Sequence, residues 1–249
     1  MRMRKLWLVL AGFMAAAGVA QAESGMPQEI VAAAESTAVL CEYEEDAGAL
    51  ALFNRKAVQA VAEKLGAQAA FAEAGEGEAL EGLMQGRFDL VLGAVPQEEE
   101  AEHFACSVPY AYNRQAVIVR GDAGEGFETD GRTPALADTA EEQLEQLVSG
   151  RADYMIWDVF SVLAYLDEHP LADIAVASYL DEAEPVSFLL SGEKEEQRTA
   201  VDEALSVLMK DGTIAGLSLE CLGYDASVAP QTQTEAEPDP EQTVEDVQQ

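Results

Sequence analysis

Basic residues are scarce in this chain of 249 residues, which has 14 Lys and Arg against 47 Asp and Glu and a formal net charge of −33. A surface of that sign repels nucleic acid and attracts cations or basic partners, so we expect no nucleic-acid partner. A solvated acidic surface suited to high salt is the other explanation of this charge. The chain has only two histidines, His103 and His169, and no Cys-x-x-Cys, which disfavours a zinc site and identifies no other metal.

Catalytic motifs are missing as well. The sequence contains no Gly-x-Ser-x-Gly nucleophile elbow, no Gly-x-x-x-x-Gly-Lys phosphate loop and no His-Glu-x-x-His. We therefore expect a protein that is not an enzyme and uses no cofactor.

The N-terminus has the pattern of an export signal. A basic start, MRMRK, is followed by the apolar run LWLVLAGFMAAAGVA and by AQA, so residues 1–22 are predicted to be a secretory signal peptide. A membrane anchor is the alternative, but the run is short for a spanning helix. Cleavage after Ala22 leaves 11 basic and 47 acidic residues, a net charge of −36. Because no cysteine follows the cut, we expect a periplasmic protein with neither lipid anchor nor membrane insertion.

Cysteine is also rare, and its three copies are Cys41, Cys106 and Cys221. Export would bring them into an oxidising compartment. One disulfide and one remaining thiol is the simplest arrangement, and all three cysteines are candidates because the sequence does not identify the pair.

What the chain does contain is an alternation of strand-like and helix-like segments, which is typical of parallel α/β construction. Strands are predicted at 38–43, 67–72, 88–95, 114–121, 152–158, 173–180 and 186–192. Helices are predicted at 49–66, 76–86, 138–150, 159–169 and 193–212. The segment 122–133, rich in glycine and charge, is the candidate crossover between two lobes.

One junction occurs twice. Residues 84–95 read MQGRFDLVLGAV and residues 148–159 read VSGRADYMIWDV, so Gly-Arg-x-Asp stands both times between a helix-like segment and an apolar strand. Glycine can adopt the left-handed conformation that closes a helix. The repeat favours two similar lobes, although such junctions occur in many α/β proteins.

Four segments in a fixed order carry a resemblance to a known family. They are LMQGRFDLVLGAV, AEHFACSVPYAYNRQAVIVR, LVSGRADYMIWD and LMKDGTIAGLSLECLG. Together with export, they resemble the family 3 extracellular solute-binding proteins, the periplasmic receptors of polar amino-acid importers. The resemblance implies an α/β fold of two lobes, each a sheet flanked by helices, with a cleft between them that closes by a hinge on ligand.

The expected organisation follows from the resemblance and from composition. The C-terminal stretch is rich in Pro, Gln, Thr and acids and has almost no large apolar residue, which is typical of disorder. The predicted divisions are the signal peptide at 1–22, the first part of lobe 1 at 38–120, lobe 2 at 121–192, C-terminal helices packing back toward lobe 1 at 193–225, and a disordered acidic tail at 226–249.

The resemblance implies only half of the family's ligand site. The family's Thr-Pro-Glu-Arg, whose Arg clamps the ligand carboxylate, is replaced by QEEE at 97–100, and Glu100 would repel a carboxylate. The Pro-Pro-Phe segment and the Gly-Thr-Thr turn are also absent. Asp158 resembles the Asp that receives the ligand amino group. We therefore expect a cationic or amine-bearing ligand, with these candidate contacts: Asp158, Glu100, Glu45, Tyr110 and Trp157.

Three of these candidates also have a purely structural explanation. Tyr110 and Trp157 could supply rings for cation–π contact, but Trp157 is also suited to core packing and Tyr110 to the hinge. Glu100 belongs to an acidic run that is typical of a solvated helix face.

Two functions of different classes follow. The first is a monomeric solute receptor that delivers a small ligand to the permease of an ABC-type importer. The alternative is a periplasmic accessory protein of the same fold that docks a partner such as a quinoprotein dehydrogenase or a cytochrome, which the missing ligand contacts favour. A dehydratase of this architecture would need cationic groups that these segments lack.

Overall fold

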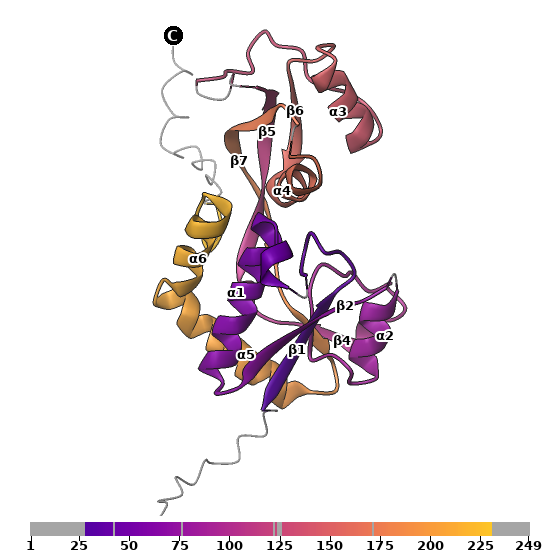
Figure 1. Cartoon of the computed structure of the whole chain (residues 1–249), viewed down its shortest axis with the longest axis vertical. Helices are drawn as coiled ribbons and strands as arrows, with labels where there is room; N and C mark the ends of the chain where they lie inside the picture. The colour runs from indigo at the N-terminus through magenta and orange to yellow at the C-terminus, as the bar shows by residue number, and fades with distance from the viewer. Residues whose placement is uncertain are drawn as a thin grey trace, which may run out of the picture.

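The computed structural model describes residues 28–41, 43–75, 77–121, 123, 126–170 and 172–230. These residues form two sheets with helices packed on them, stacked one above the other (Figure 1). The predicted signal peptide and residues 231–249 of the predicted tail lie outside this part of the chain. No helix within the described ranges is long and apolar enough to cross a membrane.

The larger lobe is built on a five-stranded sheet of order β2-β1-β3-β8-β4. Its strands are β1 (Glu29–Ala34), β2 (Gln68–Glu73), β3 (Leu90–Val91), β4 (Phe104–Cys106) and β8 (Leu189–Ser191). β1, β2 and β3 are parallel, and β8 runs antiparallel to β3 and β4. Alternate residues of β1 enter two separate apolar clusters, as Ala33 does on one face and Ala32 on the other, so helices cover both faces.

Four helices complete the larger lobe: α1 (Ala49–Lys64), α2 (Glu78–Met84), α5 (Glu195–Lys210) and α6 (Thr213–Leu222). α1 and α2 are the crossovers between the parallel strands. α5 and α6 pack against α1 and against each other. Two short 3-10 helices, η1 (Glu44–Asp46) and η2 (Ala101–His103), lie in the loops after β1 and before β4.

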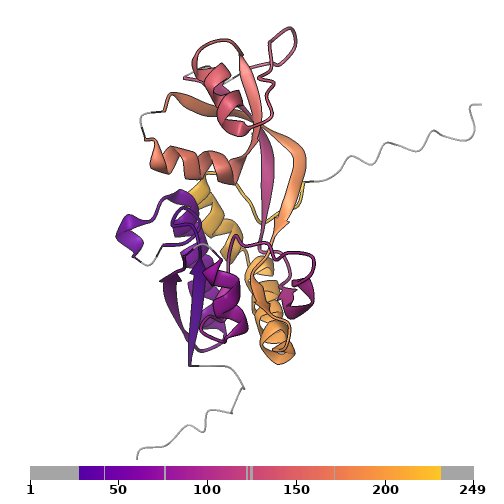
Figure 2. The ribbon, with the colours of Figure 1, turned by 90° about the vertical axis from the view of Figure 1, so that its right-hand side faces the viewer.

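The smaller lobe is a three-stranded antiparallel sheet of order β6-β5-β7. It consists of β5 (Ala111–Arg120), β6 (Tyr154–Asp158), β7 (Ile174–Val186), α3 (Ala140–Val148) and α4 (Val159–Glu168). In Figure 2, α4 lies at the edge of the smaller lobe that faces the larger one. The first residue of α4 and the last residue of β6 therefore stand at the junction of the lobes.

The chain crosses between the lobes at two adjacent points. Ser107 N donates a hydrogen bond to Phe188 O at 2.9 Å, and Tyr110 N donates one to Val186 O at 2.9 Å. The strand at 111–120 pairs only within the smaller sheet, so the crossover lies at 107–110 and not at 122–133, and lobe 2 begins before residue 121. The apolar pattern of this strand predicted burial but could not indicate which of the two sheets receives it.

The predicted strand at 38–43 is wrong. The strand that opens the larger sheet is EIVAAA at 29–34, whose alanines are weak strand formers and gave no strand signal. Residues after it form a turn in which Val39 N and Leu40 N both donate to Ser36 O at 3.0 Å.

The repeated Gly-Arg-x-Asp junction has the predicted geometry. Gly86 follows α2 with φ of 71°, and Gly150 follows α3 with φ of 75°. Both values lie in the left-handed region that favours glycine. Each glycine closes a helix before a strand, β3 in the larger lobe and β6 in the smaller one.

Candidate functional site

Asp158 is held rigidly at the start of α4. Its Oδ1 accepts hydrogen bonds from Ser161 N at 2.9 Å and from Asn113 Nδ2 at 2.7 Å. Asn113 Oδ1 in turn accepts one from Phe160 N at 3.0 Å. Asp158 is thus the N-cap of α4, and a carboxylate at the positive end of a helix is stabilised.

The second carboxylate oxygen of Asp158 is available. Among the described residues, Oδ2 accepts no hydrogen bond and none of the four ion pairs involves Asp158. The side chain is half-buried, at the end of β6 that meets the larger lobe. Asp158 therefore has one carboxylate oxygen that is oriented by the bonds to Oδ1 and is itself free of hydrogen bonds among the described residues.

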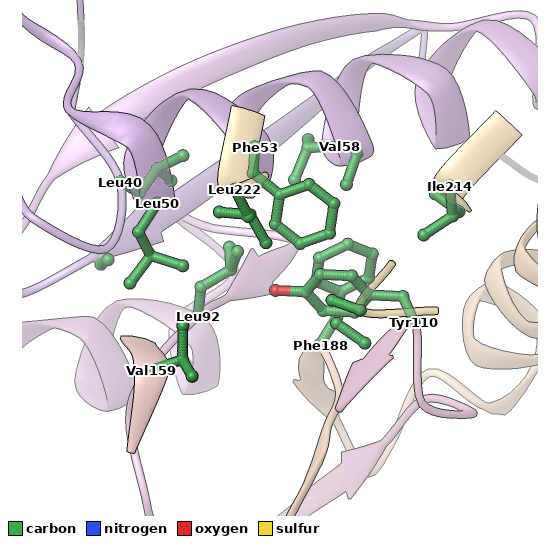
Figure 3. Close-up of a cluster of buried hydrophobic side chains, with 14 of the residues drawn as sticks. Leu40, Leu50, Phe53, Val58, Leu92, Tyr110, Val159, Phe188, Ile214 and Leu222 are labelled. Atoms are coloured by element: carbon green, nitrogen blue, oxygen red, sulfur yellow. The ribbon is translucent and has the colours of Figure 1, made fainter. Parts of the chain in front are cut away.

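Tyr110 is a core residue and not a ligand contact, which corrects the prediction. Its side chain is 1 % exposed, it stacks on Phe188 with ring centroids 4.3 Å apart, and Phe53 packs on it as well (Figure 3). Its hydroxyl donates to Asn54 Oδ1 at 2.8 Å. Burial raises the pKa of Tyr110, because the phenolate is poorly solvated there. The Pro-Tyr segment lies at the crossing between the lobes, but the burial of Tyr110 depends on Phe188, far along the chain.

Trp157 lies on the other side of its strand from Asp158, since successive side chains of a strand alternate. It pairs with Ala116 of β5 and packs against the main apolar cluster. Its ring centroid is 5.9 Å from that of Tyr165 in α4. The structure therefore does not bring Trp157 and Asp158 together and gives Trp157 the core-packing role.

Glu100 and Glu45 are both exposed on short turns of the larger lobe. Glu100 is the residue before η2, and Glu45 lies within η1. Neither forms one of the four ion pairs of the described residues. No group of three or more His, Cys, Asp or Glu that could hold a metal is found within the described ranges.

The predicted disulfide is wrong, because Cys41, Cys106 and Cys221 are all free thiols. They lie on the loop after β1, at the end of β4 and in α6. Cys41 is buried and its Sγ donates to Tyr43 O at 3.0 Å, whereas Cys106 is exposed. Burial raises the pKa of the Cys41 and Cys221 thiols, which keeps both protonated.

Two buried polar residues of α1 were missed by the sequence analysis. Asn54 Nδ2 donates to Val39 O at 2.8 Å, and Arg55 Nη1 donates to Cys41 O at 2.6 Å. The Arg55 guanidinium also lies 3.9 Å from the centroid of the Phe71 ring. Together they fix the loop that leads from β1 to the lobe junction. The available signal was three consecutive polar residues, Asn54, Arg55 and Lys56, within the otherwise apolar stretch ALALFNRKAV.

The lobes touch away from the crossings. α1 packs against α4, and Gly48, the N-cap of α1, lies so close to Asp167 that an added Cβ would overlap its carboxylate. Four apolar side chains from both lobes gather at this contact (Figure 3). They are Leu40, Leu50 and Leu92 of the larger lobe and Val159 of the smaller one, all at most 4 % exposed.

The chain belongs to the bacterial extracellular solute-binding proteins, family 3, whose family model matches residues 30–223. This match agrees with the two-lobed α/β fold and with the resemblance found in the four sequence segments.

Two similar curated proteins carry names from the same class. One is the "Probable amino-acid ABC transporter-binding protein" of Haemophilus influenzae, 24% identical over 214 residues, which are 77% of this chain and 83% of that protein. The other is the L-cystine-binding protein TcyA of Bacillus subtilis, 23% identical over 207 residues, which are 74% of this chain and 77% of that protein.

Solved structures show the same fold. The unliganded, open L-cystine solute receptor of Neisseria gonorrhoeae is 23% identical with a TM-score of 0.63, over 80% of this chain and 95% of that chain. An ancestral arginine-binding protein bound to arginine is 22% identical with a TM-score of 0.53, over 80% of this chain and 100% of that chain. At these identities the likeness concerns the fold alone.

Proposed function

We propose that the protein is a solute receptor that binds a small amine-bearing ligand at Asp158 and delivers it to the permease of an ABC-type importer. The available Oδ2 of Asp158, held at the lobe junction by two hydrogen bonds to Oδ1, is the observation that carries the proposal. An ammonium group there would gain a charge-assisted hydrogen bond. The adjacent crossings at 107–110 and 187–188 supply a hinge about which the lobes can close on a ligand.

The names of similar proteins support an amine-bearing ligand. Two of them bind L-cystine, and one was solved with arginine bound. Cystine carries two amino groups, and arginine carries an amino group and a guanidinium. Glu100, at the position of the family's carboxylate clamp, supports a ligand whose positive groups outweigh its carboxylates.

A thermal-shift screen of the exported protein tests the proposal. The panel would contain L-cystine, L-arginine, putrescine, a quaternary amine and L-glutamate. A ligand present at about 100 times its Kd stabilises the folded state by about 2.7 kcal/mol. We expect a selective rise in melting temperature for one of the amine-rich solutes and none for L-glutamate.

The variant Asp158→Asn identifies the site, because asparagine keeps the N-cap acceptor and removes only the charge. We expect the melting temperature without ligand to stay nearly unchanged and the ligand-induced rise to disappear. Asp211→Asn is the matched control, since Asp211 also accepts a backbone hydrogen bond at the start of a helix, from Thr213 N at 3.0 Å in the larger lobe. A ligand shift that survives in Asp158→Asn would contradict the proposed site.

Partner docking without transport is the second candidate, and the contact between the lobes favours it. Opening the lobes to admit a solute would expose Leu40, Leu50, Leu92 and Val159, which costs about 25 cal/mol per Å² of apolar surface. A closed protein of this charge would suit a basic periplasmic partner such as a cytochrome or a quinoprotein dehydrogenase. The absence of any shift across the solute panel would favour this function.

A further inference from the structure

An open apolar groove runs along the smaller lobe, away from Asp158. It encloses about 410 Å³ between α3 and α4. Its walls come from five residues of the α3 segment and one of α4: Glu141, Leu144, Glu145, Val148, Ser149 and Tyr165.

The floor of the groove is hydrophobic and uncovered. Val148 is 57% exposed, while Leu144 anchors the helix in the core at 7%. Tyr165 is half-buried, and its ring stacks on His169 with centroids 4.2 Å apart, which fixes the ring as one wall. An apolar surface with such fixed walls is typical of a contact site for another molecule.

The two helices that form the groove are acidic. Val148 is the last residue of α3 and Tyr165 lies in the last turn of α4, so both helices end at the groove. Their end carbonyls already have polar partners, because Arg120 Nη1 donates to Leu147 O at 2.9 Å and His169 Nδ1 lies 3.0 Å from Tyr165 O. Neither helix has a basic residue in its last turn, and the two together contain five acids and no Lys or Arg.

The acidic walls remain attractive to a cation. Glu141 is exposed and forms none of the four ion pairs of the described residues. Glu145 pairs with Arg151 at 2.8 Å, but both side chains are more than half exposed, so solvent screens this pair and an incoming cation can compete with it.

We propose that this groove docks a segment of a partner protein in which a large apolar residue is flanked by lysines or arginines. The apolar residue would cover Val148 and Tyr165, and the flanking cations would meet the acidic walls. Because the groove is open along its length, it suits a side of a helix or an extended segment better than an enclosed solute. The inference does not depend on solute binding at Asp158.

A labelled peptide with a leucine pair between lysines is the probe, and fluorescence anisotropy at low and physiological ionic strength is the measurement. We expect binding to the full-length exported protein that weakens with salt. Val148→Asp should weaken it about tenfold, because a charge then stands on the floor of the groove. Val207→Asp is the matched control, since Val207 is 42% exposed on α5 of the other lobe, and it should leave the affinity unchanged.

Charge is tested separately with Glu141→Gln and its control Glu196→Gln on α5. Both positions are exposed, so the folded state should be intact, which far-UV circular dichroism can verify. Weakening by Glu141→Gln alone supports the groove. Equal losses of peptide affinity in the groove and control variants, or no peptide binding at all, would overturn the proposed docking groove. Binding of free tetrabutylammonium with the same dependence on these variants would also overturn it, because the groove would then be a site for small cations.

Discussion

Two buried tyrosine hydroxyls near the crossings have opposite surroundings. Tyr110 donates to Asn54 Oδ1 at 2.8 Å, whereas the buried hydroxyl of Tyr224 has no hydrogen-bond partner among the described residues. Tyr224 is 7% exposed, and its ring centroid lies 5.1 Å from that of Tyr179 in β7. An unpaired buried polar group destabilises the fold, while a satisfied one does not. The two residues therefore form a natural pair for mutation.

The first prediction compares Tyr110→Phe with Tyr224→Phe. Tyr110→Phe leaves Asn54 Oδ1 buried without its donor, so we expect a loss of about 1–3 kcal/mol in the free energy of unfolding. Tyr224→Phe removes an unpaired hydroxyl and should be neutral or stabilising. Urea unfolding monitored by circular dichroism measures both. Equal destabilisation by the two changes would show that another group satisfies Tyr224.

The same tyrosines predict a stability loss in alkali. Burial raises the pKa of Tyr110 and of Tyr224 above the ordinary value of about 10. Above that pH the unfolded chain loses these protons while the folded chain keeps them, so the unfolded state binds fewer protons and stability falls as pH rises. Melting temperatures measured from about pH 8 to pH 11 should decline, and the decline should be shallower in Tyr224→Phe.

Sequence reasoning at the residue scale found what local chemistry specifies. Asp158 is the last residue of the strand predicted at 152–158, and its position at a strand end is confirmed. Tyr110 was misplaced because its burial is decided by Phe188 and Phe53, which only the fold brings near. Asn113 could not be linked to Asp158, since that contact depends on the pairing of β5 with β6.

At the scale of elements, the start of α1 and the end of α4 are in close contact across the junction of the lobes. Gly48 permits it, because any Cβ there would overlap the Asp167 carboxylate. A carboxylate beside the positive end of α1 is also electrostatically favourable. Helix packing and electrostatics thus both hold the lobes together at this point.

We predict that Gly48→Ala destabilises the protein by about 1 kcal/mol, the lower end of overpacking costs, because Asp167 is a short surface side chain that can rotate. The double variant Gly48→Ala with Asp167→Ala should recover most of this loss, which a double-mutant cycle of urea unfolding would measure. Additive effects would mean that the two residues do not interact.

The elements themselves were predicted unevenly. The five α-helices between residues 49 and 212 follow apolar periodicity, and all of them except α4 are followed within two residues by a glycine; both are local signals. β1 was missed because three of its six residues are alanine, which is a weak strand former. Alanine fits a strand that is buried on both faces of a sheet, but its presence does not indicate such a strand. The sequence could not predict which lobe contains β5, because this depends on the pairing of β5 with β6 and β7, which lie far along the chain.

For the molecule as a whole, net charge dominates the electrostatics. The chain carries a formal charge of −33, and only four ion pairs occur within its described part. Self-repulsion of such a surface disfavours the compact state. Salt at about 0.1 M reduces the Debye length to about 10 Å and screens much of this repulsion.

We therefore expect added salt to stabilise the protein. The melting temperature should rise by about 3 °C for each kcal/mol of repulsion that is screened. Differential scanning calorimetry in NaCl and in KCl would check this, and the two salts should act alike because screening does not depend on the cation. A fall in melting temperature would show that the ion pairs outweigh the repulsion.

The smaller lobe is one uninterrupted stretch of chain whose two ends meet. Ala111 pairs with Val186 at its base, and Cys106 pairs with Leu189 on the other side of the crossings. The molecule therefore has the connectivity of one gene segment inserted into another at a hairpin. A short turn joining Cys106 to Leu189 would close the larger lobe as a continuous polypeptide. The excised lobe would lose its contacts with the C-terminal segment, which include the hydrogen bond from Tyr112 N to Ala226 O at 2.7 Å and the packing of Tyr179 on Tyr224. The smaller lobe is thus a continuous module of the chain that begins and ends at the two adjacent crossings.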